Sequence, residues 1–348
     1  SSDLEVMKVL IVGSDSIHVL SFVSGLPLNI DCRFLTESPC GFDGVKEEII
    51  VSFRSLNPLA IFRSNNRLGI VLSEMKPDVV HVHQINRLAY FVTRLCEKLD
   101  IPVVSTAWGS DVLVVPKKNI FFRYLVKKSL KRSKFVTADS QDMIDKMAAL
   151  SASSEDKYLL LQYGIEMVSA GIKEDIIYSN RLHKPNYRIG QIIDYFNEMQ
   201  ENHPEWRLVI AGEGSDTSGL RLKIKRYNLE EKVDFVGWLS STQNNMWYAK
   251  AKIYISIPIS DGTSVSLLEA MSAGCLPVVP DIKVSHEWVE DGKNGVIEQV
   301  DVNPLMEALK LDQQICAEFN RDLIKEKASR EHSMVAFQMI YKRAIDKG

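Results

Sequence analysis

Short apolar segments rich in β-branched residues alternate with amphipathic stretches in two consecutive series along this chain. Such alternation is typical of parallel sheets whose strands are connected by helices. The pattern therefore predicts an α/β protein with two Rossmann-like, doubly wound domains. The first series of predicted strands covers residues 6–13, 78–83, 102–106 and 135–138, and the second covers residues 175–179, 207–212, 233–237, 253–256 and 276–279.

The length of 348 residues suits two domains of ordinary size. We place the first domain at residues 1–168 and the second at residues 169–325, because the segment from Val168 to Gly171 is small and weakly patterned. Residues 326–348 end a helical stretch that begins near Met306. Ligands of doubly wound sheets bind at the carboxyl ends of the strands, so two domains that face each other would enclose a central cleft.

Composition argues against several classes of protein. A formal net charge of -3 disfavours a dedicated nucleic-acid-binding protein, which needs a dominant basic surface. No apolar run is long enough to span a membrane, and the first residues lack the features of a signal peptide, so we expect a cytoplasmic protein. The cysteines are scattered without the spacing of a zinc site, which predicts free thiols.

Residues 260–279 read as a polar loop, then a helix, then a buried strand. The first N–H groups of a helix lack intrahelical partners and attract anions such as phosphate. Asp261 before the helix and Glu269 within it could hold hydroxyls of the sugars that flank a diphosphate. This segment therefore predicts a nucleotide-sugar site. The alternative is a solvated loop that only caps the helix.

The same segment resembles the signature E-G-F-G-L-x-x-L-E-A-M-A-x-G-x-P-V-V of the family-4 retaining glycosyltransferases of GT-B fold. Glu269 matches the second family glutamate, which binds the donor ribose. Asp261 replaces the first, which lies beside the transferred sugar, and we expect it to act in catalysis. The resemblance implies that the residues contacting the donor here are Gly262, Thr263, Ser264, Val265, Ser266 and Glu269.

Residues 179–185 resemble the family's G-R-L segment, in which an arginine and a later lysine neutralise the departing diphosphate. Fixed cations suit this step because they stabilise the transition state, where the phosphate charge grows, more than the ground state. The resemblance assigns these catalytic roles to Arg181 and Lys184. The family lysine usually lies five or six places after the arginine, where this chain has Asn186 and Tyr187. Lys184 therefore either acts from a different position or is a solvated loop charge.

Two further strand ends match family segments at the donor. The first implies donor contacts from Gly212 and Glu213, although glycines there also suit an ordinary turn. The second implies backbone contacts with the base from Val236 and Gly237. Trp238 either stacks on the base or belongs to the core. No metal-binding pattern follows a predicted strand, so we expect transfer without a metal or cofactor.

Residues 103–111 resemble the family's H-G-x-D segment, with Trp108 in place of the histidine. An indole donates one hydrogen bond and accepts none, so its contact with a sugar must differ from that of histidine. We assign Trp108 to acceptor binding and Asp111 to catalysis, where it would orient an acceptor hydroxyl. The alternatives for Asp111 are orienting a nearby loop or capping the next helix.

The segment after the first predicted strand keeps only Gly13 of the family's glycine-rich loop. We assign Ser16 and His18 to acceptor binding, although a lone histidine is more often structural. His81 and His83 alternate onto one side of a strand, but without a third ligand they do not predict a metal site.

The segment from Lys117 to Lys134 contains many basic residues and no acidic residue, interleaved with aromatic and aliphatic ones. A basic amphipathic helix on a nearly neutral protein favours contact with anionic lipid. The alternative is a solvated helix whose apolar side lies in the core.

The resemblance implies a retaining, metal-independent hexosyltransferase that uses a UDP- or GDP-linked sugar. The acceptor would be a hydroxyl of a glycan or polyprenyl-linked glycan in cell-surface polysaccharide or glycoconjugate synthesis. It also implies that residues 326–348 cross back to the first domain. The enzyme would be cytoplasmic, and peripheral at the inner face of the cell membrane if the basic segment binds lipid. The alternatives are another GT-B enzyme, such as a nucleotide-sugar epimerase, and a catalytically silent nucleotide-sugar-binding module.

Overall fold

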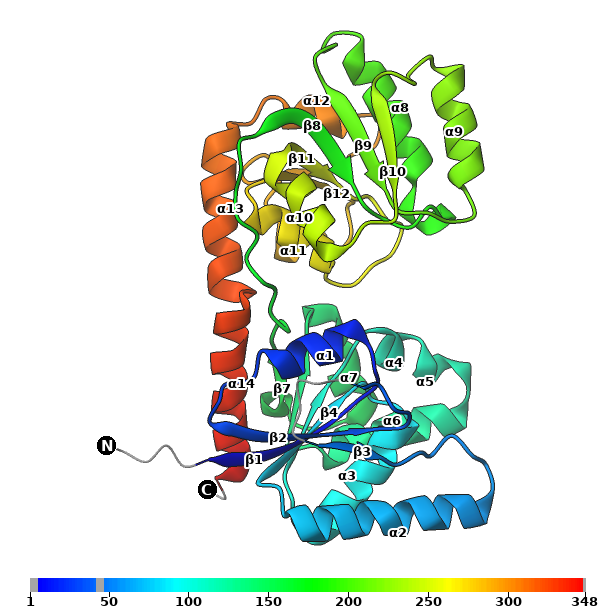
Figure 1. Ribbon diagram of the computed structural model, residues 1–348, viewed down its shortest axis with the longest axis vertical. Coiled ribbons are helices and arrows are strands. Elements are labelled where there is room, and N and C mark those ends of the chain that lie inside the picture. Colours follow the sequence, from blue (N-terminus) through cyan, green and yellow to red (C-terminus); the bar gives the residue numbers. More distant parts are fainter. Residues whose placement is uncertain (1–5, 42–46, 347–348) are drawn as a thin grey trace, which may run out of the picture. The chain divides into compact units, whose positions relative to one another are not determined.

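The computed structural model describes residues 6–41 and 47–346, apart from the side chains of Ile17 and His18. The chain forms two compact units (Figure 1). Unit 1 contains the residues up to Gly164 and those from Arg330 onward, and unit 2 contains Ile165–Ser329. The expected domain ranges, with boundaries after residues 168 and 325, stay a prediction.

Unit 1 is built on a parallel seven-stranded sheet with the order β3-β2-β1-β4-β5-β6-β7. In β1, Leu10 lies opposite Arg33 of β2 and Ile11 lies opposite His81 of β4. The strands are β1 (Met7–Val12), β2 (Ile30–Thr36), β3 (Glu48–Ile50), β4 (Val79–His83), β5 (Val103–Thr106), β6 (Phe135–Ala138) and β7 (Tyr158–Leu160).

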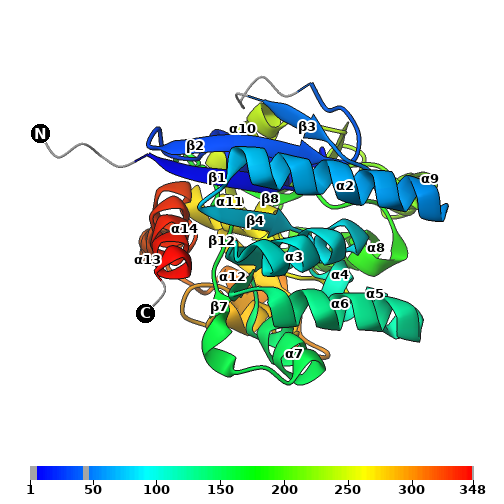
Figure 2. The same ribbon diagram turned by 90° about the horizontal axis from the view of Figure 1, so that it is seen from below.

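Helices cover both faces of this sheet (Figure 2). Val9 and Ile11 point to the face packed by α1 and α14, whereas Leu10 and Val12 point to the face packed by α2 and α3. This alternation is the period of two that a strand imposes on its side chains. The helices of unit 1 are α1 (Ile17–Ser24), α2 (Pro58–Met75), α3 (Arg87–Leu99), α4 (Ser110–Leu113), α5 (Val115–Lys118), α6 (Ile120–Arg132), α7 (Gln141–Ser151), the 3-10 turn η1 (Glu155–Lys157) and α14 (Arg330–Ile345).

Unit 2 has a parallel six-stranded sheet with the order β10-β9-β8-β11-β12-β13. The strands are β8 (Glu174–Ser179), β9 (Arg207–Ala211), β10 (Val233–Gly237), β11 (Ala251–Ile255), β12 (Leu276–Val279) and β13 (Val296–Ile297). One face packs against α8 (Ile189–Gln200), α9 (Thr217–Arg226) and α12 (Pro304–Ala308). The other packs against α10 (Ser241–Lys250), α11 (Val265–Ser272) and α13 (Gln313–Lys327). The short 3-10 turns are η2 (Pro185–Tyr187) and η3 (Ser285–Glu287).

The α/β class and the doubly wound architecture are confirmed, and every predicted strand is present. The patterns missed β2, β3, β7 and β13, most of which are too short to give a periodic signal. The predicted helical stretch from about Met306 to Asp346 consists of three helices, α12, α13 and α14. A new helix starts at Gln313 because the Asp312 carboxylate accepts hydrogen bonds from the N–H groups of Gln314 and Ile315. Among the helices that the structure describes, none is long and apolar enough to cross a membrane.

Candidate functional site

The loops that follow β8, β9, β10 and β11 converge at one edge of the sheet in unit 2. All these strands are parallel, so their carboxyl ends lie at the same edge. The loops bond to one another: the Ile259 N–H donates to the Asn186 carbonyl over 2.8 Å, and the Gly212 N–H donates to the Gly237 carbonyl over 2.7 Å. The structure therefore brings the predicted donor-binding segments together.

Arg181 links the β8 loop to the start of α11. Its Nη2 donates to Asp261 Oδ2 over 2.5 Å, and its Nη1 donates to the Ser264 hydroxyl. The guanidinium also lies over the ring of Tyr187, with 4.6 Å from Cζ to the ring centroid. The side chains of Arg181 and Asp261 are 13% and 25% exposed, so their ion pair is largely shielded from water. Arg181, predicted to neutralise the leaving diphosphate, and Asp261, predicted to lie beside the transferred sugar, are thus direct neighbours.

The first turn of α11 offers backbone N–H groups at this location. Leu267 and Leu268 donate to the Ser264 carbonyl and begin the helical bonding, so the N–H groups of Val265 and Ser266 precede any intrahelical acceptor. Ser264 makes no side-chain capping bond in this helix and instead accepts from Arg181. Gly262 is exposed and faces open space. An anion placed here would therefore meet both the helix N-terminus and a fixed guanidinium.

Two acidic side chains of the site are partly desolvated. Burial raises the pKa of the Asp261 carboxyl, whereas the charge of Arg181 lowers it. Burial also raises the pKa of the Glu269 carboxyl, which lies one turn along α11, whereas a hydrogen bond from Tyr248 lowers it. Carboxylates that have lost water gain most from new hydrogen-bond donors, such as sugar hydroxyls.

Gly212 has a structural reason to be glycine. Its φ is +99°, and a Cβ at this position would lie 2.5 Å from the Arg181 carbonyl oxygen. The neighbouring Glu213 is exposed, and its carbonyl accepts from the N–H of His183. The turn therefore packs directly on the segment that carries Arg181, which agrees with both the turn and the donor-site interpretations.

At the end of β10, the indole of Trp238 is 71% exposed, so the alternative that placed it in the core is wrong. Val236 is half-buried against the core of unit 2, and Gly237 has a φ of +70°. An exposed aromatic ring at this edge is available to stack on a planar ligand.

The segment expected to carry the family lysine has another role here. Lys184 is exposed, whereas Asn186 donates through Nδ2 to the Ser260 carbonyl over 3.1 Å. Arg188 pairs with Glu298 over 2.5 Å and donates to the Ile257 carbonyl. Both side chains hold the β8 loop against neighbouring strand ends.

In unit 1, Asp111 is almost fully buried, and both its oxygens accept backbone hydrogen bonds. The Ile85 N–H donates to Oδ2 over 2.7 Å, and the Trp108 N–H donates to Oδ1 over 2.9 Å. Burial raises the pKa of Asp111, whereas these hydrogen bonds lower it. The contacts agree with the alternative in which Asp111 orients loops.

The predicted acceptor residues also make structural contacts. The indole of Trp108 packs near the ring of Tyr163, with centroids 5.0 Å apart. Ser16 caps α1 by accepting from the Val19 N–H over 3.4 Å. The prediction for His18 falls on a side chain that lies outside the described residues.

The two strand histidines are buried side by side in β4. His81 lies 2.6 Å from the Tyr341 hydroxyl through Nδ1 and 2.6 Å from the Thr106 hydroxyl through Nε2. Burial lowers the pKa of His83 to about 3, so this ring is neutral at physiological pH. No group of three or more His, Cys, Asp or Glu side chains suited to a metal ion occurs in the part of the chain that the structure describes.

The predicted basic segment forms α5 and α6, and both interpretations find support in different parts of it. Leu125, Val126 and Leu130 of α6 are buried in unit 1. At the N-terminal end of α6, however, Ile120 and Phe121 are 85% and 57% exposed. The end of this helix therefore presents apolar side chains beside exposed basic ones, which are Lys117, Lys118 and Arg123.

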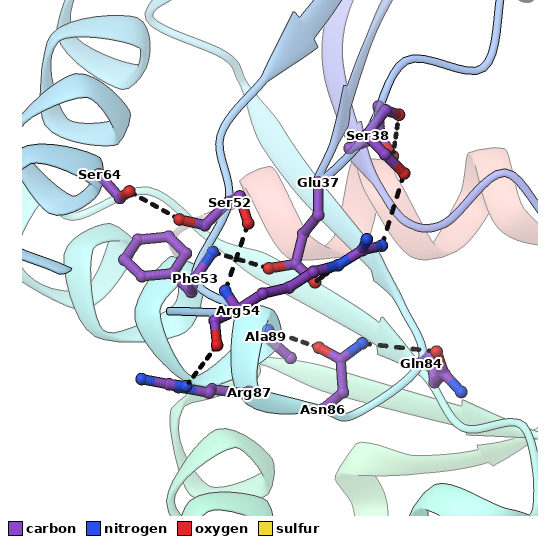
Figure 3. Close-up of polar contacts among 11 residues, drawn as sticks. Glu37, Ser38, Ser52, Phe53, Arg54, Ser64, Gln84, Asn86, Arg87 and Ala89 are labelled. Atoms are coloured by element: carbon purple, nitrogen blue, oxygen red, sulfur yellow. Dashed lines mark hydrogen bonds and ion pairs between the residues drawn. The ribbon is translucent and has the colours of Figure 1, made fainter. Parts of the chain in front are cut away.

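The sequence patterns missed a polar cluster after β2, β3 and β4 (Figure 3). Glu37 accepts from the Phe53 N–H over 2.7 Å and lies 3.5 Å from the Arg54 guanidinium. Arg87 donates to the Ser55 carbonyl over 2.9 Å. Gln84 has a φ of +75°, which is unusual for a residue with a side chain. No local pattern marks these residues, because they meet only when the strands align.

Two family models match this chain. The model described as glycosyl transferases group 1 matches residues 168–328, and the model described as glycosyl transferase 4-like matches residues 8–140. A similar solved structure is that of HepE from Anabaena in complex with UDP. Its TM-score is 0.79 at 12% identity, and the alignment covers 97% of this chain and 100% of that one.

Two curated relatives have related descriptions. Alpha-monoglucosyldiacylglycerol synthase of Acholeplasma laidlawii is 23% identical, with 65% of this chain and 64% of that protein covered. GDP-mannose:cellobiosyl-diphosphopolyprenol alpha-mannosyltransferase of Xanthomonas campestris is 24% identical, with 68% and 65% covered. This chain thus spans slightly less than two thirds of their length. The two matched models together cover most of the chain, which belongs to the GT-B glycosyltransferases of family-4 type.

Proposed function

We propose that this chain is a retaining, metal-independent glycosyltransferase that uses a UDP- or GDP-linked sugar. Its acceptor is a hydroxyl of a glycan or lipid-linked glycan in cell-surface polysaccharide or glycoconjugate synthesis. The observation that carries the proposal is the meeting of Arg181, Asp261 and the first turn of α11, with Glu269 one turn further along.

Each part of the donor has a partner in this arrangement. The diphosphate lies at the start of α11 and against Arg181, and the ribose hydroxyls donate to Glu269. Asp261 faces the transferred sugar, and Trp238 stacks on the base. In the reaction, the bond between the anomeric carbon and the phosphate oxygen breaks while the acceptor oxygen bonds to the same face of that carbon. The departing phosphate takes the acceptor proton, and no carboxylate acts as nucleophile.

Arg181 and the N–H groups of α11 supply the main electrostatic stabilisation. Negative charge grows on the diphosphate as the bond breaks, and preorganised donors favour that charge without reorganising. The ion pair with Asp261 keeps the guanidinium in place. The proposal gives Lys184 a secondary role, because its side chain is exposed.

A lipid-linked acceptor has support from two sources. The names of the relatives from A. laidlawii and X. campestris indicate a diacylglycerol glycolipid and a diphosphopolyprenol, respectively. In this chain, exposed apolar and basic residues adjoin at the start of α6. We infer that this end of α6 contacts an anionic membrane surface at the cytoplasmic face.

The test is donor consumption by the purified chain with lipid-linked and soluble glycan acceptors, in the presence of EDTA. We expect UDP or GDP release only with an acceptor, and a product whose anomeric configuration equals that of the donor. An inverted product, or a requirement for divalent metal, would contradict the proposal. Conversion of the donor without any acceptor would favour an epimerase-like enzyme.

A nucleotide-sugar-binding module without transfer is the second candidate. The observation that favours it is Asn186, which lies at the family lysine position and is bonded to the Ser260 carbonyl. Calorimetric binding of a nucleotide-sugar without turnover on any acceptor would select this candidate.

A further inference from the structure

A small pocket adjoins Asp261, and the proposed reaction does not yet use its interior. One side of the pocket is formed by the loop and first turn of α11, from Asp261 to Leu267. The other side is formed by the segment from the end of β12 to Trp288. Its volume is about 20 Å³, which is room for one group of the size of a water molecule or a methyl group. All the residues that line it belong to unit 2.

The inner wall of the pocket is mainly apolar. Leu267, Val279 and Trp288 line it and are 6%, 2% and 5% exposed. The rest of this wall consists of Pro258, Pro280, Ile282 and Val284, together with the buried polar residues Ser256 and Ser285. Most of the wall offers no hydrogen-bond partner, so an apolar group gains more from it than a water molecule does.

The mouth of the pocket is polar and belongs to the proposed donor site. Asp261 and Ser264 line the pocket, and both also accept hydrogen bonds from the Arg181 guanidinium. Gly262 lies between them in the chain, is exposed, and has no atom within 4 Å of the place that a Cβ would take. A sugar that binds beside Asp261 can therefore direct one substituent into the pocket.

One hydrogen-bond donor of the wall lacks an acceptor. The indole Nε1 of Trp288 is buried and has no hydrogen-bond partner among the residues that the structure describes. The backbone of Trp288 is held on both sides, because its N–H donates to the Ser285 carbonyl over 3.1 Å and its carbonyl accepts from Asn294 Nδ2 over 3.0 Å. A buried N–H without an acceptor costs free energy, so a ligand that brings an acceptor to it gains affinity.

Two departures from the family signature leave more room at this place. Thr263 lines the pocket at the position where the signature has phenylalanine, and Asp261 stands where it has glutamate. Both side chains are smaller than those of the signature. The donor sugar that suits this chain is therefore expected to carry additional bulk beside Asp261.

We propose that the pocket receives the acetamido group of the transferred sugar, so that the donor is a nucleotide-linked N-acetylhexosamine. The methyl group contacts the apolar wall, and the amide oxygen accepts from the Trp288 indole. The inference rests on the proposed function for the place of the sugar beside Asp261. A plain hexose would offer a hydroxyl to the same apolar wall, and a 6-deoxyhexose would leave the indole N–H without an acceptor.

The test compares donors that differ in this group, each linked to whichever of UDP and GDP binds the protein more tightly. The probes are the N-acetylglucosamine, glucose and 6-deoxyglucose donors. Burial of one methyl group corresponds to about a fourfold change in affinity, so calorimetry should show the N-acetylglucosamine donor binding at least about fourfold more tightly than the glucose donor.

The contrary outcomes of this comparison are distinct. Equal affinity for the N-acetylglucosamine and glucose donors, or tightest binding of the 6-deoxyglucose donor, would overturn the inference while leaving the proposed function intact. Failure of UDP, GDP and all three sugar donors to bind would contradict the proposed function itself.

A variant that fills the pocket separates its contribution from that of the nucleotide. Val284 lines the pocket and is half-buried, so Val284→Phe should remove the preference for the acetamido donor and leave the affinity for free UDP or GDP unchanged. The control Val300→Phe makes the same change at a position that is 88% exposed and should keep the preference. Should Val284→Phe not fold, Ile282→Phe narrows the same pocket. A preference that persists in the folded pocket variant would contradict the proposal.

The indole of Trp288 gives a second readout that does not depend on affinity. The chain has five tryptophans, and in nitrogen-15 spectra of labelled tryptophan the Trp288 indole signal is identified by its loss in Trp288→Phe. We expect this signal to shift when the N-acetylglucosamine donor binds, and to shift much less with the glucose donor, because only the acetamido oxygen accepts from the indole. Equal shifts with the two donors would overturn the assignment.

Discussion

The two units use the carboxyl ends of their strands differently. In unit 2, Arg181, Asp261 and Glu269 meet with part of each side chain still accessible. In unit 1, the predicted residues at the corresponding edge hydrogen bond to the backbone of the same unit. Asp111 accepts from two backbone N–H groups, and Ser16 caps α1. The carboxylate that matches a family motif in unit 1 is therefore occupied by backbone donors, whereas the one in unit 2 pairs with an arginine side chain and keeps part of its surface accessible.

Exposure separates the two roles. Asp111 is 2% exposed, whereas the Asp261 side chain is 25% exposed. A carboxylate with two backbone N–H partners and no access to solvent has little capacity for a ligand. One that pairs with a single arginine at a helix start can exchange partners when a sugar arrives. Substitutions in both units test this division.

Replacing Arg181 by Ala should have the largest effect on activity. We expect kcat to fall by roughly 10²–10³, the usual effect of removing one group that stabilises developing charge, with a smaller loss of donor affinity. Steady-state kinetics and calorimetry measure the two quantities separately. Arg207→Ala is the control, because that arginine forms an exposed pair with Asp234. A rise in KM at unchanged kcat would show that Arg181 only binds the donor.

Replacing Asp111 by Ala should chiefly reduce stability. The N–H groups of Ile85 and Trp108 would lose their buried acceptor, and we expect about 2–3 kcal/mol less free energy of unfolding. Denaturant titration measures the loss, with Asp145→Ala on the exposed side of α7 as the control. UDP binding in unit 2 should stay intact at temperatures where the variant is folded. Full stability with lost transfer would instead make Asp111 catalytic.

Charge removal beside the exposed apolar end of α6 should weaken membrane binding. We expect the double variant Lys118→Gln, Arg123→Gln to lose about 2 kcal/mol of affinity for anionic vesicles at low salt, at about 1 kcal/mol per charge. Flotation measures the change. The control is Lys76→Gln, Lys98→Gln, which removes the same charge at the C-terminal ends of α2 and α3. Equal losses in both variants would indicate a general charge effect.

Replacing Trp238 by Ala should have the smallest effect. Loss of a stacking surface on the base should weaken UDP binding by about 1 kcal/mol, or roughly fivefold. Stability should not change, because the indole is 71% exposed. Met246→Ala, at an exposed apolar position of α10, is the control for calorimetry. Unaltered UDP affinity would place the base elsewhere.

Much of the fold was predictable because its signals are local. The strands that carry the site are short apolar runs, and the loop, helix and strand of residues 260–279 follow directly from their pattern. β3 and β13 escaped prediction because three and two residues form no periodic signal. The break between α12 and α13 was not predicted, because a helical pattern continues across it. The cap at Asp312 shows where the second helix begins.

The candidate site was predictable in part. Arg181, Asp261 and Glu269 belong to sequence motifs in which a cation and two carboxylates already indicate a nucleotide-sugar site. The sequence could not show that Arg181 pairs with Asp261, that Asn186 ties two loops together, or that Trp238 is exposed rather than in the core. These facts depend on residues that are far apart in the chain and meet only when parallel strands align their ends.

The α/β class, the two series of strands and the polar, acidic character of the loop before α11 follow from the sequence, because hydrophobic period, helix starts and charged residue types are properties of neighbouring residues. Which polar side chains bond to the backbone and which stay accessible depends instead on tertiary packing, because their partners come from distant parts of the chain. The hydrogen-bonded network of Asn180, Tyr248 and Tyr254 depends on that packing as well. Its hydrogen bonds join α10 and β11 to the residue that follows β8, and packing of these elements brings their side chains within bonding distance.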